Sequence, residues 1–392
     1  MKKLAIITTH PIQYNAPLFR LLAQRGKISI KVFYTWGETV LKNKYDPGFG
    51  KVIEWDIPLL DGYKYQFIEN TSKKPGSHHF NGITNPTLIR EIENWEADAL
   101  LVYGWSFRSH LKCLRYFHKK IPVYFRGDST LLDEKDFGIK LLLKKCFLKW
   151  IYRHVDMALY AGQNNKAYFQ TYGLKNEQLV FAPHAIANER FCQAVKIDFR
   201  KQHGIVDSET VFLFAGKLEL KKNPGLLLEA YSALNQPQTR LVIVGNGHLE
   251  DELKTKHSSL GQSLKDRIIF MDFQNQSVIP DIYKMADVVA LPSQGPGETW
   301  GLAINEAMAS GRAVLVSNKC GCAKDLAIDG LTGYSFESGN TTELVSKMKK
   351  MLDKNLIQKM GIESKLLIAS WSFEKVAEAI ESLLIQGTVK SV

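Results

Sequence analysis

The sequence predicts an α/β protein of two doubly wound domains, each a parallel β-sheet with helices on both faces. Three observations support this prediction. The chain has 392 residues, which is too long for one ordinary core and sufficient for two domains of common size. It is 45% hydrophobic and 23% charged, as globular proteins are. Short apolar runs, rich in β-branched and aromatic residues, alternate with longer helical patterns, and this alternation favours parallel sheets.

The predicted elements form two series along the chain. Strands are expected at 3–8, 28–34, 99–102, 123–125, 157–160 and 179–181, and then at 211–215, 240–244, 268–271, 288–291 and 314–316. Helices are expected between them, among others at 17–25, 139–154, 224–232, 280–285 and 302–310. Residues 70–86 contain Lys-Lys-Pro-Gly and Asn-Pro, which predict a long mobile loop.

A domain boundary is expected between residues 185 and 205, because strand patterns restart near Val211 after a polar stretch. We therefore expect an N-terminal Rossmann-like domain over 1–190 and a C-terminal domain over 191–370, which the motifs described below concern. Residues 371–392 are expected to form a helix that packs back on the N-terminal domain.

The five cysteines are scattered and odd in number, which indicates a reducing compartment rather than a disulfide framework. Cys320 and Cys322 form a C-x-C pair without a second pair or a histidine cluster nearby, so we predict no metal site there. No stretch approaches the roughly 20 apolar residues of a membrane-spanning helix. The apolar run after Met1 is too short for a signal peptide and predicts a buried first strand. We expect a cytoplasmic protein.

The net charge of +11 is confined to one half of the chain. Residues 1–190 contain 28 Lys and Arg against 17 Asp and Glu, whereas residues 191–392 contain 23 of each. The N-terminal half is therefore expected to face an acidic partner: an anionic membrane, a phosphate-bearing acceptor or a nucleic acid. We predict no nucleic-acid binding, because the basic segments match no recognised nucleic-acid module.

The strongest functional signal lies in residues 291–311, LPSQGPGETWGLAINEAMASG. An apolar strand ends in a Pro/Gly loop, and a helix opens near Gly301, so free amides and the positive end of the helix dipole form an anion site. Gly301 lets a phosphate approach the backbone closely. Glu298 precedes the helix and Glu306 lies in its second turn. A carboxylate accepts hydrogen bonds from vicinal hydroxyls, so one glutamate suits a ribose and the other a donor sugar.

A second cluster, FAGKLELKKNP at 214–224, follows another predicted strand. Its loop is expected at the same carboxyl edge of the sheet, where ligands of such folds bind. Lys217 and Lys222 are candidates to hold a diphosphate and to stabilise its charge as it departs. Gly245 and Gly247 form a G-x-G turn after the next strand, and for this pair we favour a packing role.

These motifs resemble the donor domain of family-4 glycosyltransferases, which have the GT-B fold. That family has Gly-Arg-Leu with a lysine five residues after the arginine; here Gly216-Lys217-Leu218 precedes Lys222, so Lys217 replaces the arginine. The family's E-x7-E motif, usually around Phe-Gly, corresponds to Glu298–Glu306 around Trp300-Gly301. The resemblance continues through AMASG at 307–311 and GLTG at 330–333, and it covers about residues 180–380.

The resemblance implies two Rossmann-like domains that face each other across a cleft, retention of anomeric configuration, and no metal or other cofactor. The absence of a D-x-D triplet from the sequence is consistent with metal independence. It implies that Lys217 and Lys222 bind the donor diphosphate, that Glu298 contacts the transferred sugar, and that Glu306 binds ribose. The amides of Gly301 and Leu302 would contact phosphate, and the nucleobase would lie near residues 270–274. The donor-binding set is therefore Gly216, Lys217, Lys222, Phe273, Glu298, Trp300, Gly301, Leu302 and Glu306.

The N-terminal half departs from the family pattern. Many members have Gly-Gly after the first strand, where this chain has THPIQYNAP at 9–17. His10, Gln13 and Tyr14 of this loop are candidates for the acceptor side; His10 is either a proton acceptor or a packed loop histidine. Many members also have a histidine after a middle strand, where this chain has Arg126-Gly127-Asp128. Arg126 or Asp128 acts in its place, or the site works by another arrangement.

Residues 138–154, GIKLLLKKCFLKWIYRH, form a basic amphipathic helix pattern. Such a helix can lie in a membrane interface, where each cation near anionic lipid contributes about 1 kcal/mol. The alternative is a domain helix with its apolar stripe in the core. The membrane interpretation assigns the contact to Lys140, Lys144, Lys145, Lys149 and Trp150.

Together these features predict a retaining glycosyltransferase of the bacterial surface-polysaccharide type, peripheral on the inner face of the cell membrane. It would move a sugar from a nucleotide-diphosphate donor to a hydroxyl of a lipid-linked glycan. A UDP-sugar is favoured over a GDP-sugar as the donor. Two alternatives stay open: a GT-B nucleotide-sugar epimerase or phosphorylase, and a non-catalytic sugar-nucleotide-binding protein. The sugar, the linkage and the oligomeric state are not determined by the sequence.

Overall fold

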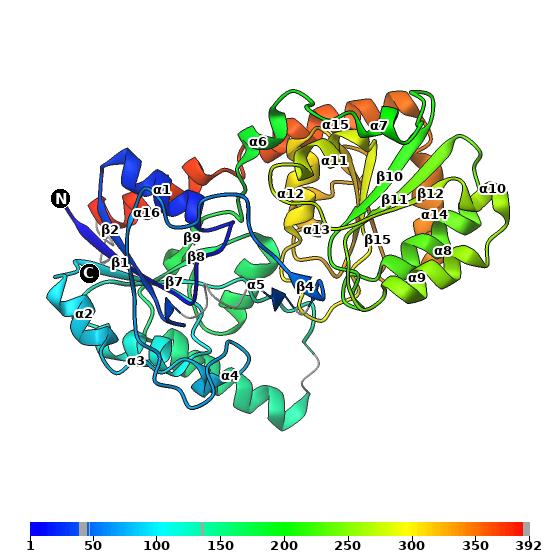
Figure 1. Ribbon diagram of the computed structural model, residues 1–392. Helices are drawn as coiled ribbons and strands as arrows, with labels where there is room; N and C mark the ends of the chain where they lie inside the picture. The colour runs from blue at the N-terminus through cyan, green and yellow to red at the C-terminus, as the bar shows by residue number, and fades with distance from the viewer. Residues whose placement is uncertain (39–44, 47, 135–136, 387–392) are drawn as a thin grey trace. The chain divides into compact units, whose positions relative to one another are not determined.

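The computed structural model describes residues 1–38, 45–46, 48–134 and 137–386. The chain forms two compact units (Figure 1). The first comprises Met1–Lys44, Pro58–Pro183 and Phe373–Val392, and the second comprises Tyr45–Ile57 and His184–Ser372. The change of unit at Pro183 differs slightly from the sequence-based boundary at residue 190. The assignment of Tyr45–Ile57 to the second unit was not expected.

The first unit is built on a parallel sheet in the order β5-β2-β1-β6-β7-β8-β9. Its strands are β1 (Lys3–Thr8), β2 (Ser29–Tyr34), β5 (Lys64–Phe67), β6 (Ala99–Tyr103), β7 (Val123–Arg126), β8 (Met157–Tyr160) and β9 (Leu179–Phe181). Its helices are α1 (Ala16–Arg25), α2 (Leu88–Asn94), α3 (Arg108–Phe117), α4 (Gly138–Tyr152), α5 (Gln163–Thr171) and α16 (Phe373–Gln386). Short 3₁₀ turns cover Phe80–Gly82 and Asn176–Gln178.

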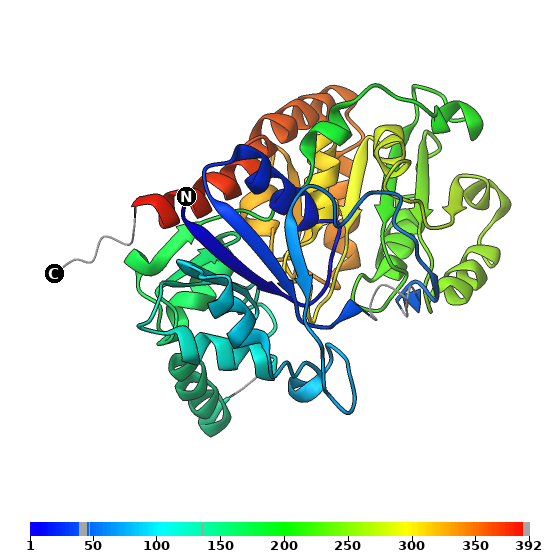
Figure 2. The same ribbon diagram turned by 60° about the vertical axis from the view of Figure 1, so that its left-hand side comes forward.

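The C-terminal helix α16 packs beside α1, as Figure 2 shows. The contact includes an ion pair in which Arg25 donates two hydrogen bonds, of 2.7 and 2.9 Å, to the buried carboxylate of Glu381. The hydroxyl of Tyr124 on β7 donates to the backbone oxygen of Leu383 at 2.9 Å. Helix α16 is therefore an integral layer of the first unit, although it follows the second unit in sequence.

The second unit has a parallel sheet in the order β12-β11-β10-β13-β14-β15. Its strands are β10 (Thr210–Ala215), β11 (Thr239–Val244), β12 (Ile268–Met271), β13 (Val288–Leu291), β14 (Ala313–Ser317) and β15 (Gly333–Phe336). Its longer helices are α8 (Pro224–Leu234), α9 (Glu250–Ser258), α12 (Leu302–Ala309), α14 (Thr341–Lys350) and α15 (Lys354–Ile368). Shorter ones are α6 (Asn188–Cys192), α7 (Phe199–Gln202), α10 (Gln262–Lys265), α11 (Ile279–Met285) and α13 (Ala323–Leu326).

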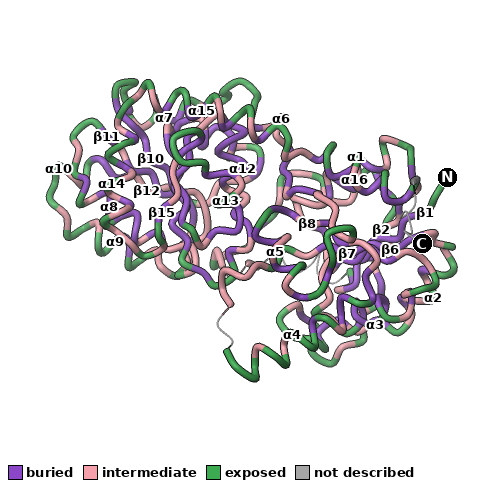
Figure 3. The backbone as a smooth tube through the Cα atoms, turned by 180° about the vertical axis from the view of Figure 1, so that it is seen from behind, coloured by how far each residue is buried: buried purple, intermediate pink, exposed green. Residues whose placement is uncertain are grey.

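Helices cover both faces of each sheet, so the central strands are buried, as the purple tube of Figure 3 shows. This matches the predicted doubly wound architecture. Two strands were not predicted, β5 and β15. Both are edge strands, and their sequences, KYQF and GYSF, lack the continuous apolar run of a central strand. The hairpin of β3 (Tyr45–Asp46) and β4 (Lys51–Val52) also escaped prediction, because each strand has two residues.

Candidate donor site and comparison with known proteins

The second sheet reverses its strand order between β10 and β13, which pair in parallel. From β10 the chain proceeds outward to β11 and β12; from β13 it proceeds outward in the opposite direction. The loops that follow β10 and β13 therefore diverge at the carboxyl edge of the sheet, and ligands of open α/β sheets bind at this kind of switch point. These two loops contain the lysines and glutamates singled out in the sequence.

An ion pair joins the two loops. The ammonium of Lys222 lies 2.6 Å from Oε2 of Glu298, and the hydroxyl of Ser293 donates to the same oxygen at 3.1 Å. The side chains are only 18% and 7% exposed, respectively. The sequence singled out both charged residues but gave no indication that they pair. A cation and a carboxylate thus meet where a phosphate and a sugar hydroxyl could take their places.

Helix α12 begins at this edge. Its first amides have no intrahelical acceptor and are available to an anion. Gly301 precedes the helix at φ +106°, a left-handed conformation that favours glycine. A Cβ there would lie 2.7 Å from Cδ2 of Leu291. Gly301 is thus required by the turn itself, in addition to any close approach of a ligand.

Glu306 lies one turn into α12, where it is buried. Its Oε2 accepts a hydrogen bond of 2.7 Å from the hydroxyl of Tyr283 on α11. Tyr283 was not predicted, and no local sequence signal connects it with Glu306. Trp300 is also buried; its indole N–H donates to Oδ1 of Asn305 at 2.8 Å, and its ring lies 5.6 Å from that of His184. The structure therefore gives Trp300 a packing function within the loop.

The loop between β13 and α12 is hydrogen-bonded to a turn that the sequence analysis did not select. The amide of Gly321 donates to the carbonyl of Glu298, and the amide of Cys322 donates to that of Trp300, both at 3.0 Å. Cys320 and Cys322 are fully buried, and burial raises the pKa of the Cys320 thiol to about 12. These cysteines are therefore neutral packing residues. Among the described residues, no group of three potential ligands is arranged to hold a metal ion.

The glycines after β10 and β11 pack against each other. A Cβ on Gly245 would lie 1.9 Å from the carbonyl oxygen of Gly216, and one on Gly247 would lie 2.5 Å from that of Leu218. The G-x-G turn thus has the packing role favoured from the sequence. Gly216 itself has room for a methyl group, since its Cβ would be 3.7 Å from Phe214.

Lys217 and Phe273 both contact the segment Tyr45–Ile57. The Lys217 ammonium lies 2.8 and 3.0 Å from the two carboxylate oxygens of Asp46. The ring of Phe273, in the predicted nucleobase region, lies 4.7 Å from that of Phe49 and 6.2 Å from that of Trp55. The sequence analysis missed these partners, because they are distant along the chain.

The candidate acceptor-side residues lie in the first unit. His10, Gln13 and Tyr14 follow β1, at the point where the first sheet reverses its strand order between β1 and β6. Nδ1 of His10 is 2.9 Å from the hydroxyl of Thr9, and the imidazole contacts Trp36 edge-on. Burial lowers the pKa of His10. A neutral imidazole at the end of a strand can accept a proton.

Arg126 and Asp128 occupy different environments. Arg126 is buried, and its guanidinium donates to the carbonyl oxygens of Ala182 and Pro183 at 2.8 and 3.0 Å. It therefore fixes the end of the segment that leaves the first unit. Asp128 is exposed in the loop after β7. A buried histidine, His110 on α3, lies at the end of the neighbouring strand β6, with Nδ1 3.0 Å from the carbonyl oxygen of Gly104. Its Nε2 is 2.9 Å from the hydroxyl of Thr35, and burial lowers its pKa to about 4.

Helix α4 leaves much of its apolar surface uncovered. Leu148, Ile151 and Tyr152 at its end are buried, but the earlier turns are mostly exposed, as the green tube of α4 in Figure 3 shows. These exposed side chains are Phe137 just before the helix and Ile139, Leu142, Leu143 and Phe147 within it, between 46% and 82% exposed. The interpretation of α4 as a fully core-packed helix is therefore wrong for its first two turns.

The predicted membrane residues divide into two groups. Lys140, Lys145 and Lys149 are exposed, whereas Lys144 pairs with Glu134 at 2.8 Å. Trp150 is half-buried against the core and between Arg115 and Arg153, so it does not belong to the exposed apolar face. None of the helices in the described residues is long and apolar enough to cross a bilayer.

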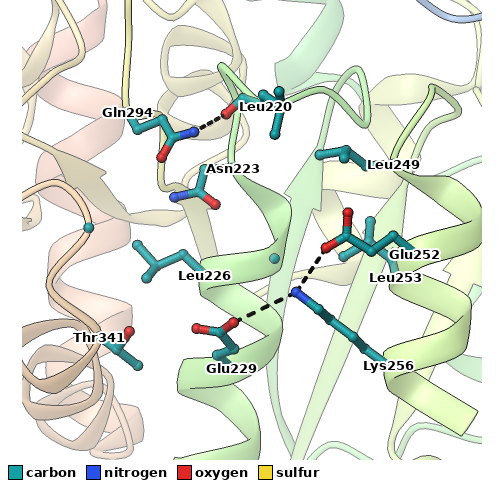
Figure 4. A pocket seen from close by; sticks show the side chains of 12 residues that line it. Leu220, Asn223, Leu226, Glu229, Leu249, Glu252, Leu253, Lys256, Gln294 and Thr341 are labelled. Carbon is teal, nitrogen blue, oxygen red and sulfur yellow. Dashed lines mark hydrogen bonds and ion pairs between the residues drawn. The ribbon is translucent and has the colours of Figure 1, made fainter.

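A pocket of about 300 Å³ lies beside the first turns of α8 and α9 (Figure 4). Lys256 approaches it and pairs with Glu252 at 2.9 Å and Glu229 at 3.8 Å. Gln294 closes another side by donating to the backbone oxygen of Leu220 at 2.8 Å. The described residues that line this pocket include none of the predicted donor-site residues, so it is distinct from the Lys222–Glu298 site.

Comparison with known proteins finds a family that part of the chain resembles. Residues 195–367 match the family model of glycosyl transferases group 1. This segment is therefore similar to that family. It contains both candidate loops, with Lys217, Lys222, Glu298 and Glu306. The matched residues include none of the first unit. The motifs that carry the family resemblance in the sequence also lie outside that unit.

Curated proteins match parts of the chain. Identity is 36% over 124 residues with an uncharacterized glycosyltransferase of Methanocaldococcus jannaschii, covering 31% of each chain. It is 28% over 208 residues with a lipopolysaccharide 1,2-N-acetylglucosaminetransferase of Salmonella typhimurium, covering 51% of this chain and 54% of the relative. The chain thus spans between about a third and about half the length of these relatives.

Solved structures match the whole chain in fold. Anabaena HepE in complex with UDP and glucose superimposes with a TM-score of 0.70 at 17% identity, covering 98% of this chain and 100% of HepE. At this identity the likeness concerns the fold alone. Together with the two parallel sheets, it establishes the GT-B fold that the sequence motifs implied.

Proposed function

We propose that the protein is a retaining, metal-independent glycosyltransferase that moves a sugar from a nucleotide-diphosphate donor to a hydroxyl of a lipid-linked glycan. The observation that carries this proposal is the Lys222–Glu298 pair, 2.6 Å apart at the switch point beside the start of α12. It presents a cation for a departing diphosphate and a carboxylate for sugar hydroxyls within one small volume. The group 1 domain supports transfer over the two alternatives left open by the sequence.

Each residue has a proposed task. Lys222, Lys217 and the first amides of α12 stabilise the charge that accumulates on the diphosphate as its bond to the anomeric carbon breaks. Glu298 orients the transferred sugar, and Glu306, held by Tyr283, binds the ribose hydroxyls. In the first unit, His10, Gln13 and Tyr14, with Asp128, contribute to the acceptor side. Arg126 supports them by holding the backbone at Pro183.

Two comparisons support the choice of substrates. The Anabaena protein of similar fold was crystallised with UDP and glucose, which favours UDP over GDP as the donor nucleotide. The Salmonella relative bears the name of a lipopolysaccharide sugar transferase, which favours a surface-glycan acceptor. A lipid-linked acceptor of this kind requires the enzyme to work at a membrane.

Helix α4 supplies the surface for peripheral membrane binding. Its exposed apolar side chains and the exposed ammonium groups of Lys140, Lys145 and Lys149 suit an anionic lipid interface. The +11 charge of the N-terminal half acts in the same direction. We place the enzyme on the inner face of the cell membrane.

A thermal-shift panel of nucleotide sugars with EDTA present tests the donor assignment. We expect one diphosphate sugar to raise the melting temperature of the wild type and to have a much smaller effect on Lys222→Ala. Radiolabelled transfer from that donor to a lipid-extract acceptor then tests catalysis. Interconversion of the donor sugar without an acceptor would indicate an epimerase. Stable binding without turnover would indicate a non-catalytic protein.

Vesicle co-sedimentation tests the membrane assignment. We expect Leu142→Ser with Leu143→Ser to weaken binding to phosphatidylglycerol vesicles about tenfold, because two apolar side chains no longer enter the interface. Neutralising Lys140, Lys145 and Lys149 should weaken it in a salt-dependent way. Ile362→Ser with Leu366→Ser is a matched control, since these α15 side chains are equally exposed. If the α4 double variant and the α15 double variant lose vesicle binding equally, a specific role of α4 is contradicted.

A further inference from the structure

The segment Tyr45–Ile57, here called the strap, belongs to the second unit although it lies between strands of the first unit in sequence. Its hairpin of β3 and β4 packs on the loops that follow the strands of the second sheet. Two hydrogen bonds between side chain and backbone anchor its far end: the Asn275 side chain donates to the backbone carbonyl of Glu54 at 2.6 Å, and the backbone amide of Ser277 donates to Oδ2 of Asp56 at 3.0 Å.

The strap surrounds the ammonium of Lys217. Both carboxylate oxygens of Asp46 are within 3.0 Å of Nζ. The Phe49 ring lies under the same nitrogen, 5.0 Å from it to the centroid. Gly48 passes so close that a Cβ there would be 2.6 Å from Cδ of Lys217. Lys217 of the proposed donor site thus contacts three residues of the hairpin, namely Asp46, Gly48 and Phe49.

The strap also occupies the surroundings of Phe273. The rings of Phe49 and Trp55 both meet Phe273 edge-on, and the ammonium of Lys51 lies 5.7 Å from its centroid. Phe273 lies in the region proposed to face the nucleobase. The two ends of a nucleoside diphosphate, base and phosphates, therefore correspond to the two places where the strap makes its side-chain contacts.

Electrostatics determines how a donor and the strap interact. A diphosphate and the Asp46 carboxylate are both anions, and they require the same ammonium group. Burial acts to raise the pKa of Asp46, but the hydrogen bond and charge of Lys217, with the amides of Phe49 and Gly48, outweigh it and lower the pKa. Asp46 is therefore charged at neutral pH and repels a phosphate placed beside Lys217.

The pair is also weak enough to be displaced. The Lys217 and Asp46 side chains are 33% and 28% exposed, and partly hydrated ion pairs stabilise a fold only slightly. A diphosphate carries more negative charge than one carboxylate and gains additional contacts from Lys222 and α12. The exchange of Asp46 for a diphosphate at Lys217 is thus favourable at a moderate donor concentration.

We propose that the strap is a built-in occupant of the donor site: Asp46 holds Lys217 as a stand-in for the diphosphate, and the donor binds by displacing it. The inference rests on the proposed donor role of Lys217. Asp46 thereby sets the donor affinity, and strap contacts at Phe273 are exchanged for the nucleotide.

Calorimetric titration of the full chain with UDP, and separately with GDP, tests the inference. Asp46→Asn removes the charge but keeps a side-chain oxygen that can accept from the amides of Gly48 and Phe49. We expect it to bind the preferred nucleotide about fivefold more tightly than the wild type, as release of a partly exposed ion pair implies. Asp207→Asn, which removes a charge from an exposed turn of the same unit, should have the wild-type affinity.

A double-mutant cycle excludes a general effect of the substitution. On the Lys217→Ala background, Asp46→Asn should produce a clearly smaller gain, because the competed ammonium is absent and only the charge repulsion is removed. Hydrogen exchange of a peptide covering 48–57 should become faster when UDP binds to the wild type. Equal affinity of wild type and Asp46→Asn, or slower exchange of the strap with UDP, would overturn the inference and leave the donor site intact. If folded wild type and Asp46→Asn both fail to bind either nucleotide, the proposed donor site is wrong and the inference falls with it.

Discussion

Substitution of Gly321 by alanine tests whether the turn after β14 supports the donor loop. A Cβ at this position would lie 1.7 Å from the carbonyl oxygen of Thr299 and 2.5 Å from its carbonyl carbon. Both atoms belong to the backbone, so no side-chain rotation relieves the overlap. The loop must move by about 1.5 Å before an ordinary contact is restored.

The displacement has a calculable cost. It stretches the 3.0 Å hydrogen bonds from Gly321 to Glu298 and from Cys322 to Trp300 beyond bonding distance, at about 1 kcal/mol each. Overpacking adds about 1 kcal/mol or more. We therefore expect Gly321→Ala to lower the free energy of unfolding by about 3 kcal/mol. For a domain of this size the melting temperature should fall by about 6–12 °C.

Differential scanning calorimetry measures this change, and nucleotide titration measures its effect on the site. Because Glu298 and Gly301 move with the loop, we expect UDP affinity to fall at least about tenfold. Gly261→Ala is the control, since its Cβ meets nothing within 4 Å and its φ is −64°; it should change neither quantity. A Gly321→Ala protein with wild-type melting temperature and UDP affinity would refute the reasoning.

Further substitutions test single residues. Lys222→Ala should reduce turnover more than about tenfold, whereas Lys221→Ala, beside it in sequence, should not. Glu306→Gln should weaken UDP binding about tenfold in a calorimetric titration, and Tyr283→Phe, which removes the hydrogen bond to Glu306, should weaken it less. His110 has a folded pKa of about 4 against 6.5 in the unfolded chain. Below pH 6.5 the unfolded state therefore binds an extra proton, and the free energy of unfolding decreases by up to about 3 kcal/mol by pH 4. In urea titrations across this pH range, the free energy of unfolding of His110→Gln should decrease less steeply than that of the wild type.

The sequence predicted the elements that depend on local pattern. Buried central strands such as β10 and β13 are continuous apolar runs, and their positions followed from that property. The loop before α12 was also located from a local pattern, because Gly301 and the two glutamates stand at fixed spacing around one helix start, and its role as a donor site stays a prediction. The edge strands β5 and β15 were missed because their sequences have no continuous apolar run, whereas the edge strands β9 and β12 have one and were predicted.

Other features required the tertiary structure. Lys222 and Glu298 are far apart in sequence, and their 2.6 Å contact exists because β10 and β13 are neighbours in the sheet. The apolar side chains of α4 have the same helical spacing whether they face core or solvent, so only packing decided that Leu142 and Leu143 are exposed.

The sequence by itself determined the two parallel sheets and the positions of the candidate loops with their charged residues, because periodicity and residue spacing are local properties. The tertiary structure alone decided which of those residues meet. Asp46 lies on Lys217 and Gly321 lies on Thr299 through contacts between distant segments. Such contacts depend on strand order and chain crossing, which no local pattern of residues encodes.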